Sequence, residues 1–284
     1  MAAQLTSVAE IERELSGLRA LEEAGPILRT SVMTHTAWVP PEWLEAATDT
    51  LAGLGERHPS RTIVLVPEPD ASPDEIQAQV GLAHFELGNQ SVCSEVLVLR
   101  LCGRPARVPA SIVVPLLVAD LPVFLRWRGQ PEFEGAELEQ LVEVADRVIV
   151  DSSEWPGVPE VYRELVPYLE RSAWSDIAWA RTLGWRRALA GLWPGIAGLE
   201  EVRVTGPAAE ANLLAGWLRS RLGHAVRLWH NDADSLEVVA VDGAEVAAPD
   251  ADAKSPSDLL SDELDRFTRD EVYEQAVTRA VAAT

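Results

Sequence analysis

The stretch RTIVLVPEP, residues 61–69, decides the fold class of this 284-residue chain. Every position from Ile63 to Val66 is apolar, so both faces of an extended segment would be hydrophobic. A strand with two apolar faces is typical of a parallel or mixed sheet that helices cover on both sides. The stretch therefore predicts an α/β structure.

Helical and strand-like patterns alternate on both sides of this stretch. A capping box at Ser7 and Glu10 predicts the start of the first helix. Further helices are predicted over 43–57, from about 105–109, and over 136–144 and 159–170. Strands are predicted over 30–39, 79–87, 91–102, 121–127 and 147–151, with 79–87 and 91–102 paired antiparallel around Gly88 and Asn89. This alternation favours helices on both faces of the sheets.

A similar pattern recurs after residue 199. EVRVTG is predicted as a strand, Pro207 as the start of a helix and Gly223 as its end. RLWH and SLEVVAVDG are predicted strands around a polar turn at 231–234, followed by a linker over 247–257. Ser257 is expected to cap one final amphipathic helix, with Leu260, Leu264, Phe267, Val272 and Ala276 on its apolar face.

We therefore expect two sandwich-like α/β domains with mixed, largely parallel sheets flanked by helices. The boundary is expected after DSSEWPG, where turn-forming residues gather. The predicted domains are residues 1–155 and residues 156–284, the second ending in an acidic helix.

Charge and composition exclude several classes of protein. The 45 acidic and 24 basic residues give a net charge of −21, which argues against nucleic acid or an anionic membrane surface as the main partner. The apolar run over 108–125 is interrupted by three prolines and by Asp120, so it predicts a buried helix, a turn and a strand and not a membrane span. The first residues resemble no signal peptide, and we expect a soluble cytoplasmic protein.

The two cysteines are not expected to form a disulfide. Cys93 and Cys102 lie nine residues apart in one predicted strand, a span of about 30 Å. A disulfide needs Cα atoms separated by roughly 4.4–6.8 Å. Reduced, buried thiols are the expected state.

Motifs of cofactor-dependent enzymes are missing from the sequence. No strand is followed by G-x-G-x-x-G, and Lys254, the only lysine, lies outside any P-loop context. There is no G-x-S-x-G elbow, and the five histidines lack zinc-site spacing. We expect a protein that is not an enzyme and that holds no cofactor and no metal.

Polar residues follow or precede two predicted strands. Asp151 and Ser152 come directly after the strand over 147–150, and ligands of α/β sheets collect beyond such strand ends. The alternative is that they only cap the following turn. Asp120 precedes the strand that carries Trp127, and its alternative role is to end a helix and form a turn.

The segment WSDIAWARTLGWRRALAGLW, residues 174–193, is rich in Trp and Arg. Ser175 is expected to cap its helix, and Trp179, Trp185 and Trp193 cannot share one helical stripe, so at least one is expected outside the apolar face. Eight Arg and four acidic residues give residues 171–227 a charge of +4. Trp with Arg is typical of protein interfaces, and convergent Arg side chains bind phosphates or carboxylates. The alternative is a core helix whose Arg residues pair with the protein's own carboxylates.

Four stretches in order resemble the OpcA family of glucose-6-phosphate dehydrogenase assembly proteins. They are HPSRTIVL (58–65), CSEVLVLRLCG to VPLLVADLPVFLRWRG (93–129), DRVIVDSS (146–153) and WSDIAWARTLGWRRALA (174–190). The resemblance covers roughly 25–245. It implies a non-catalytic protein that binds glucose-6-phosphate dehydrogenase and promotes its active form, and thereby sets NADPH production by the oxidative pentose phosphate pathway.

This resemblance and the residue patterns together give a site hypothesis. The expected partner- or ligand-binding residues are Asp120, Trp127, Asp151, Ser152, Trp179, Arg181, Trp185 and Arg186. The alternative function is a sugar-phosphate-binding domain, or an enzyme without a recognised motif, with its ligand at the strand ends.

Overall fold

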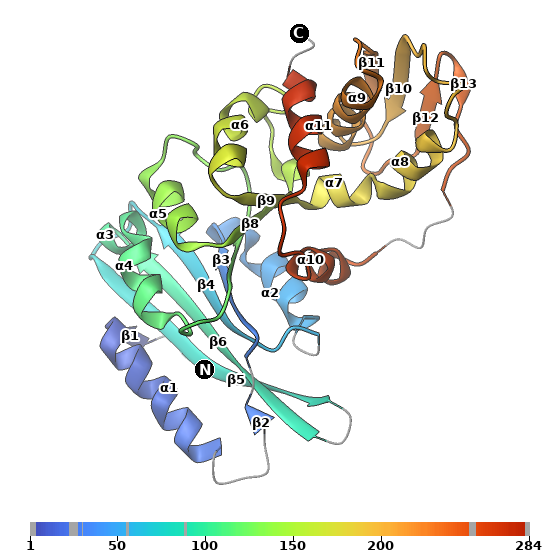
Figure 1. Cartoon of the computed structure of the whole chain (residues 1–284). Coiled ribbons are helices and arrows are strands. Elements are labelled where there is room, and N and C mark those ends of the chain that lie inside the picture. The colour runs from blue at the N-terminus through green and yellow to red at the C-terminus, as the bar shows by residue number, and fades with distance from the viewer. Residues whose placement is uncertain are drawn as a thin grey trace. The chain divides into compact units, whose positions relative to one another are not determined.

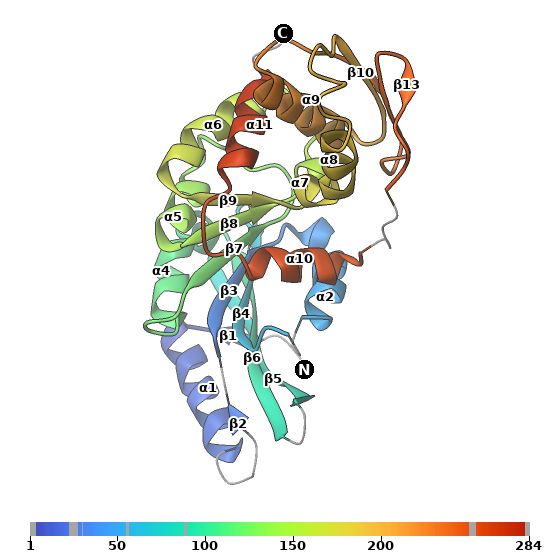
Figure 2. The ribbon, with the colours of Figure 1, turned by 45° about the vertical axis from the view of Figure 1, so that its right-hand side comes forward.

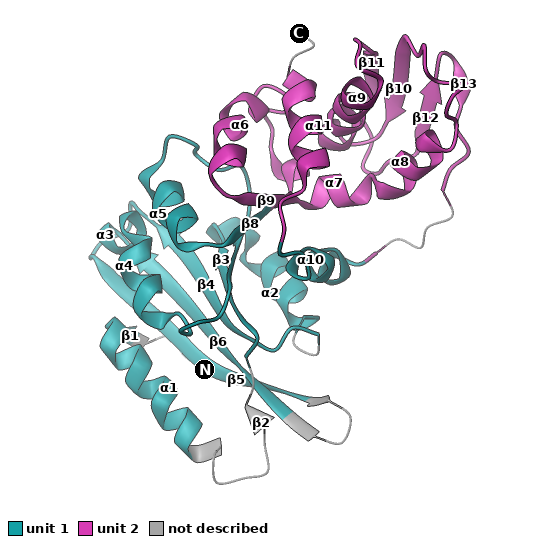
Figure 3. Ribbon diagram, in the orientation of Figure 1, with its two compact units in different colours: residues 1–149, 255–267 teal, residues 150–254, 268–284 magenta. Residues whose placement is uncertain are grey.

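The computed structural model describes residues 4–22, 28–29, 31–54, 57–87, 90–249 and 254–281. They form two compact units, coloured separately in Figure 3. Unit 1 comprises residues 1–149 and 255–267, and unit 2 comprises residues 150–254 and 268–284. The first change of unit falls after residue 149 instead of residue 155, and residues 255–267 belong to unit 1 although the sequence placed them in the second domain.

Unit 1 is built on a mixed sheet (Figure 1). Its strands run in the order β1 (Gln4–Thr6), β5 (Glu75–Leu87), β6 (Gln90–Cys102), β4 (Ser60–Glu68), β3 (Met33–Trp38), β7 (Val123–Trp127) and β8 (Arg147–Val150), and β2 (Leu28–Arg29) also pairs with β6. The pairs from β6 to β8 are parallel, whereas β1, β5 and β6 pair antiparallel. The predicted pairing of β5 with β6 is confirmed; its turn at Gly88 and Asn89 lies outside the described residues.

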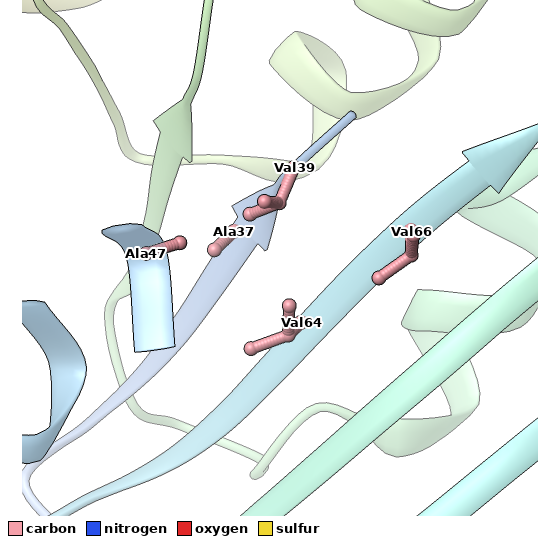
Figure 4. Close-up of a cluster of buried hydrophobic side chains, with 5 residues drawn as sticks. All are labelled: Ala37, Val39, Ala47, Val64 and Val66. Atoms are coloured by element: carbon pink, nitrogen blue, oxygen red, sulfur yellow. The ribbon is translucent and has the colours of Figure 1, made fainter. Parts of the chain in front are cut away.

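Helices cover both faces of this sheet, as the apolar run in β4 predicts (Figure 2). Ile63, Leu65 and Val66 are fully buried. On one face Val64 and Val66 pack with Ala37, Val39 and Ala47, the last from α2 (Leu44–Ala52) (Figure 4). The other helices of unit 1 include α1 (Val8–Glu22), α3 (Arg104–Arg107), α4 (Pro109–Val113) and α5 (Ala136–Val144). Burial of each large apolar side chain contributes about 1.5–3 kcal/mol, so β4 is central to the stability of unit 1.

Several local predictions are confirmed in unit 1. The backbone N–H of Ser7 donates to the Glu10 carboxylate at 2.9 Å, which is the reciprocal bond of a capping box. Cys93 and Cys102 both lie in β6, are buried and form no disulfide. Residues 108–125 form α4, a 3-10 turn and the start of β7. No helix within the described ranges is both long and apolar enough to cross a membrane.

The predicted single C-terminal helix is two helices. Ser255, not Ser257, caps α10 (Pro256–Leu264), and α11 (Glu271–Val281) follows separately. The break arises because the Asp270 carboxylate accepts the N–H groups of Val272 and Tyr273, at 3.1 and 3.0 Å, and so starts a new helix. Phe267, expected on the apolar face, is 67% exposed between them.

Helix α10 packs beside α2 in unit 1, which explains why residues 255–267 belong there (Figure 2). The Ser257 hydroxyl donates to the carbonyl of Thr50 at 2.8 Å. The His58 ring and the Ser261 hydroxyl are hydrogen-bonded at 2.8 Å, and both side chains are buried. Sequence periodicity carries no information about such a long-range docking.

Unit 2 holds a smaller mixed sheet in the order β11 (Arg227–Asn231), β10 (Glu201–Thr205), β12 (Val238–Val241) and β13 (Ala244–Glu245). Strands β10 and β11 are parallel, and the other two pairs are antiparallel. Helix α9 (Ala208–Leu222) follows Pro207 and ends at Gly223, whose φ of 76° suits glycine, as predicted. With α6 (Tyr162–Arg171) and α11, it completes an α/β unit, so the predicted fold class is confirmed.

The Trp/Arg segment differs from the predicted continuous helix. Trp174 and Ser175 lie in β9 (Ala173–Asp176), and Asp176 caps the short helix α7 (Ile177–Arg181). A second helix, α8 (Leu183–Ala190), follows after Thr182. Asp176, and not Ser175 as predicted, caps this helix, because its carboxylate accepts the N–H of Ala178 at 2.9 Å.

Helices α9 and α11 approach each other closely at Gly216. A Cβ atom at this position would lie 2.8 Å from the backbone nitrogen of Ala280 and would overlap the carbonyl oxygen of Ala276. Both atoms belong to the backbone, so a side-chain rotation cannot relieve the overlap. Glycine is required here by close packing.

We predict that Gly216→Ala lowers the free energy of unfolding of unit 2 by roughly 3 kcal/mol, because over-packing forces the two helices apart. Gly17→Ala is the matched control: Gly17 is a helical glycine with no neighbour within 4 Å of the added atom. It should raise stability by about 0.5–1 kcal/mol. Urea unfolding monitored by tryptophan fluorescence measures both, and equal effects of the two substitutions would contradict the packing argument.

Candidate functional site

Arg181 bridges two carboxylates in unit 2. Its guanidinium donates to both Asp151 oxygens at 2.9 and 2.7 Å, and through Nε to Glu210 at 2.7 Å. It also donates to the Ser153 hydroxyl at 2.7 Å. The fork geometry of arginine suits this bidentate pairing. Burial opposes the charge of Arg181, but Asp151 and Glu210 outweigh it and raise its pKa above the ordinary value.

The Glu210 carboxylate is only half satisfied. One oxygen accepts from Arg181, whereas Oε2 is buried without a hydrogen-bond partner. Burial raises the pKa of Glu210 even though Arg181 acts in the opposite direction. Glu210 therefore depends on Arg181 to keep its charge inside the unit.

A second buried cluster surrounds Asp176. Its carboxylate accepts from the backbone N–H and the hydroxyl of Ser152, at 3.0 and 2.6 Å, and from the N–H of Ala178. The Ser152 hydroxyl is also 2.9 Å from the Tyr162 hydroxyl, and the Tyr273 hydroxyl donates to Asp176 at 3.4 Å. The cluster thus ties the turn after β8 to α6, to the start of α7 and to α11.

Burial raises the pKa of Asp176 to about 7, and the charge of Asp151 adds to the increase. The hydrogen bonds from Ser152 and Ala178 act in the opposite direction but do not cancel it. Desolvation outweighs them because the carboxyl group is completely enclosed. Asp176 is therefore partly protonated near neutral pH.

The chemistry of these clusters is structural. Ser152, Asp176, Tyr162 and Tyr273 are each 1% exposed or less, so no solute reaches them in this conformation. The Ser152 hydroxyl faces a carboxylate and a tyrosine, and the cluster holds no histidine to act as its base. No group of His, Cys, Asp and Glu side chains in the described part of the chain is arranged to hold a metal ion.

The structure brings three of the predicted site residues together: Asp151, Ser152 and Arg181. Asp151 also caps the 3-10 turn that follows it, since its carboxylate accepts the N–H of Ser153 at 3.2 Å. The cap alternative for this stretch is therefore confirmed for Asp151, and the ligand-binding alternative stays a prediction. Arg181 follows the alternative in which arginine pairs with the protein's own carboxylates.

Trp179 and Trp185 differ from the exposed anchors that the sequence suggested, since they are 2% and 5% exposed. The Arg186 guanidinium lies 3.4 Å from the Trp179 ring centroid and covers that ring. The third tryptophan, Trp193, is 63% exposed, so the prediction that one of the three lies outside the apolar face is confirmed.

Asp120 and Trp127 lie in unit 1, and the other six predicted site residues lie in unit 2. Trp127 is 5% exposed and stacks on Trp38 of the neighbouring strand, with ring centroids 5.0 Å apart. Asp120 is exposed in the turn before β7, with a φ of 62°. These positions fit the turn alternative for Asp120 and a core position for Trp127.

Sequence reasoning missed Glu210, Asp176 and Tyr273 as members of these clusters. Glu210 is an acid in the apolar run AAEANLLAG, and that isolated charge was the available signal. Tyr273 comes from α11, far away in sequence.

Unit 2 also has a polar groove of about 700 Å³ between α6, α9 and α11, where Arg269 is paired with Glu274 at 2.8 Å.

Two family models match successive parts of the chain. They describe the N-terminal domain and the C-terminal domain of the glucose-6-phosphate dehydrogenase subunit, and they match residues 52–166 and residues 172–277 respectively. Both are the domain models of OpcA. The chain belongs to the OpcA family.

Curated OpcA relatives agree with this assignment. A putative OxPP cycle protein OpcA of Synechocystis is 25% identical over 70% of this chain and 44% of its own length. A protein of the same name from Nostoc punctiforme is 30% identical over 58% of this chain and 38% of its own length. The chain thus spans less than half the length of these OpcA relatives.

We predict that Arg181→Ala lowers the free energy of unfolding by about 3–5 kcal/mol, because it leaves Asp151 and Glu210 without their cation. Arg181→Lys should recover only part of this loss, since an ammonium group cannot form the bidentate pair. Arg187→Ala, on the exposed face of α8, is the control and should change stability by less than about 0.5 kcal/mol. If Arg181→Ala is as stable as this control in urea unfolding, the bridge is energetically unimportant.

A pH prediction follows from Asp176. Its pKa is about 7 in the folded protein and about 3.9 in an unfolded chain. The folded state therefore binds the proton more tightly, and this contribution to stability is complete below about pH 4 and is lost as the pH rises through about 7. The difference amounts to roughly 4 kcal/mol.

Asp176→Asn should remove this part of the pH dependence, because the amide oxygen can still accept from Ser152 and Ala178 while the group stays neutral. The measurement is urea unfolding of wild type and variant at pH 5, 6, 7 and 8. Asp120→Asn, an exposed carboxyl in unit 1, is the control and should keep the wild-type slope. Parallel pH profiles for wild type and Asp176→Asn would refute the assignment.

Proposed function

We propose that the protein is a non-catalytic factor that binds glucose-6-phosphate dehydrogenase and promotes its active form in the oxidative pentose phosphate pathway. One observation carries the proposal: two family models named for a glucose-6-phosphate dehydrogenase subunit match this chain in succession, over 52–166 and 172–277. The names of the curated relatives, OxPP cycle protein OpcA, point to the same pathway.

The geometry of unit 2 supports a binding role over a catalytic one. Arg181, the strongest candidate for holding a phosphate, donates instead to Asp151 and Glu210. A sugar phosphate at this position would have to displace both carboxylates and leave them buried without a partner, which costs several kcal/mol. The alternative of a sugar-phosphate site at the strand ends therefore has no observation in its favour.

Activation needs only a difference in affinity. A factor that binds the active form of an enzyme more tightly than the inactive form shifts the population towards the active form. Couplings of this kind are typically about 1–3 kcal/mol, or roughly 5- to 150-fold in an equilibrium constant. The activator contributes surface and rigidity and need not touch the substrate.

The test mixes the purified protein with glucose-6-phosphate dehydrogenase of the same organism. We expect co-elution in size-exclusion chromatography and a lower KM for glucose 6-phosphate, or a shift of the dehydrogenase to its active oligomer. The protein alone, given glucose 6-phosphate and NADP⁺, should form no NADPH. The proposal fails if no complex forms and the kinetics are unchanged, or if the protein alone turns over substrate.

A further inference from the structure

An uncharged, exposed segment joins α8 to β10 in unit 2 (Figure 1). Residues 191–199, GLWPGIAGL, hold no charged side chain, and their one polar side-chain group is the indole N–H of Trp193, although 24% of the whole chain is charged. Leu192 and Trp193 are adjacent, and they are 40% and 63% exposed. We call residues 191–199 the apolar knob.

The apolar knob is held by its own backbone. Successive N–H groups donate three residues back: Trp193 to Ala190 at 3.2 Å, Gly195 to Leu192 at 2.8 Å and Ala197 to Pro194 at 3.0 Å. The last residue, Leu199, is 1% exposed and anchors the segment in the unit. A partner that binds this segment has little loop entropy to remove.

The Trp193 ring has no partner within the described residues, neither a hydrogen bond nor a ring contact. Trp229, the other strongly exposed tryptophan, differs, because its indole N–H donates to Glu201 at 3.0 Å. Single exposed apolar side chains are common on protein surfaces. Tryptophan is enriched among the residues that anchor interfaces, and here an exposed leucine beside it enlarges the apolar surface of an ordered, uncharged segment.

The size of the apolar knob argues against a second copy of this chain as its occupant. Trp193 exposes 63% of its surface, which is on the order of 160 Å² of a tryptophan's roughly 250 Å². A stable interface buries about 800 Å² on each partner. Two Trp193 side chains stacked across a two-fold axis would by themselves supply only a fraction of that area. A projecting side chain suits a pocket on a larger partner, with further surface around it.

We propose that Trp193 and Leu192 insert into an apolar pocket of glucose-6-phosphate dehydrogenase and anchor the complex. The inference rests on the proposed function and names the part of unit 2 that makes the contact. The apolar knob lies inside the region that the second family model matches, residues 172–277. Because the anchor is uncharged, the complex should persist at high salt, whereas one held by arginine pairs would weaken.

The experiment measures binding to the dehydrogenase by calorimetry for wild type, Trp193→Ala, Trp193→Phe and Trp229→Ala. Trp193→Ala should raise Kd by about 30-fold or more, the effect of a hot-spot residue, and Trp193→Phe by less. Trp229→Ala is the matched control, an exposed tryptophan of the same unit, and should stay within about threefold of wild type. Saturating Trp193→Ala protein should still activate fully, because an anchor sets affinity and not the activated state.

The outcomes separate this inference from the function on which it rests. If wild type binds the dehydrogenase and Trp193→Ala binds within threefold of it, the knob is not the anchor although the proposed function stands. If wild type does not bind, both are overturned. If wild type sediments as a dimer that Trp193→Ala dissociates, the occupant is a second copy and the inference is wrong. A Kd that rises steeply with salt for wild type also contradicts it.

Discussion

The guanidinium of Arg181 organises the interior of unit 2. It holds the carboxylates of Asp151 and Glu210 together within a few ångströms, so the turn after β8, the end of α7 and the first turn of α9 meet at one cation. Each carboxylate is nearly enclosed, and the positive charge of Arg181 offsets the cost of removing both from water. The positions of those three elements are therefore coupled through one side chain.

A buried ion cluster is not the most stabilising way to fill a core. Well-packed apolar residues of similar volume are often as stable or more so, since two charges need not be removed from water. The cluster around Arg181 supplies orientation, because the planar guanidinium donates to Asp151, Glu210 and Ser153 in fixed directions. The neighbouring Asp176 cluster works in the same way with hydroxyl and backbone donors, and it brings α6 and α11 to the same place.

The sequence predicts those helices and strands that are specified by residues within or next to them. The apolar faces of β4, the Ser7–Glu10 box of α1 and the Pro207 and Gly223 limits of α9 all lie within a few residues of what they specify. The sequence does not predict the placement of a helix that depends on contacts with residues far away in the chain. Helix α10 belongs to unit 1 because Ser257 and Ser261 meet Thr50 and His58, and no periodicity within α10 encodes that.

The candidate site shows the same division. Asp151, Ser152 and Arg181 were found from position and residue type, but their roles depend on Glu210, Asp176 and Tyr273, which come from other elements. The composition of the Trp/Arg segment marks it as unusual, but it does not determine which tryptophan ring is exposed to water. The segment is two short helices with a break at Thr182 and turns after Ala190, so no single helical period places its three rings.

The return of the chain to unit 1 through α10 has a consequence for synthesis. Residues 1–149 leave the ribosome long before residues 255–267, and at about 5–20 residues per second the interval is roughly 5–20 s. Throughout that time the surface of α2 that later receives α10 is uncovered. The nascent first unit therefore lacks α10 while strands β10 to β13 are synthesised. Helix α10 is made after β13 and before α11, so each unit receives one of its helices only when residues 255–281 have been made.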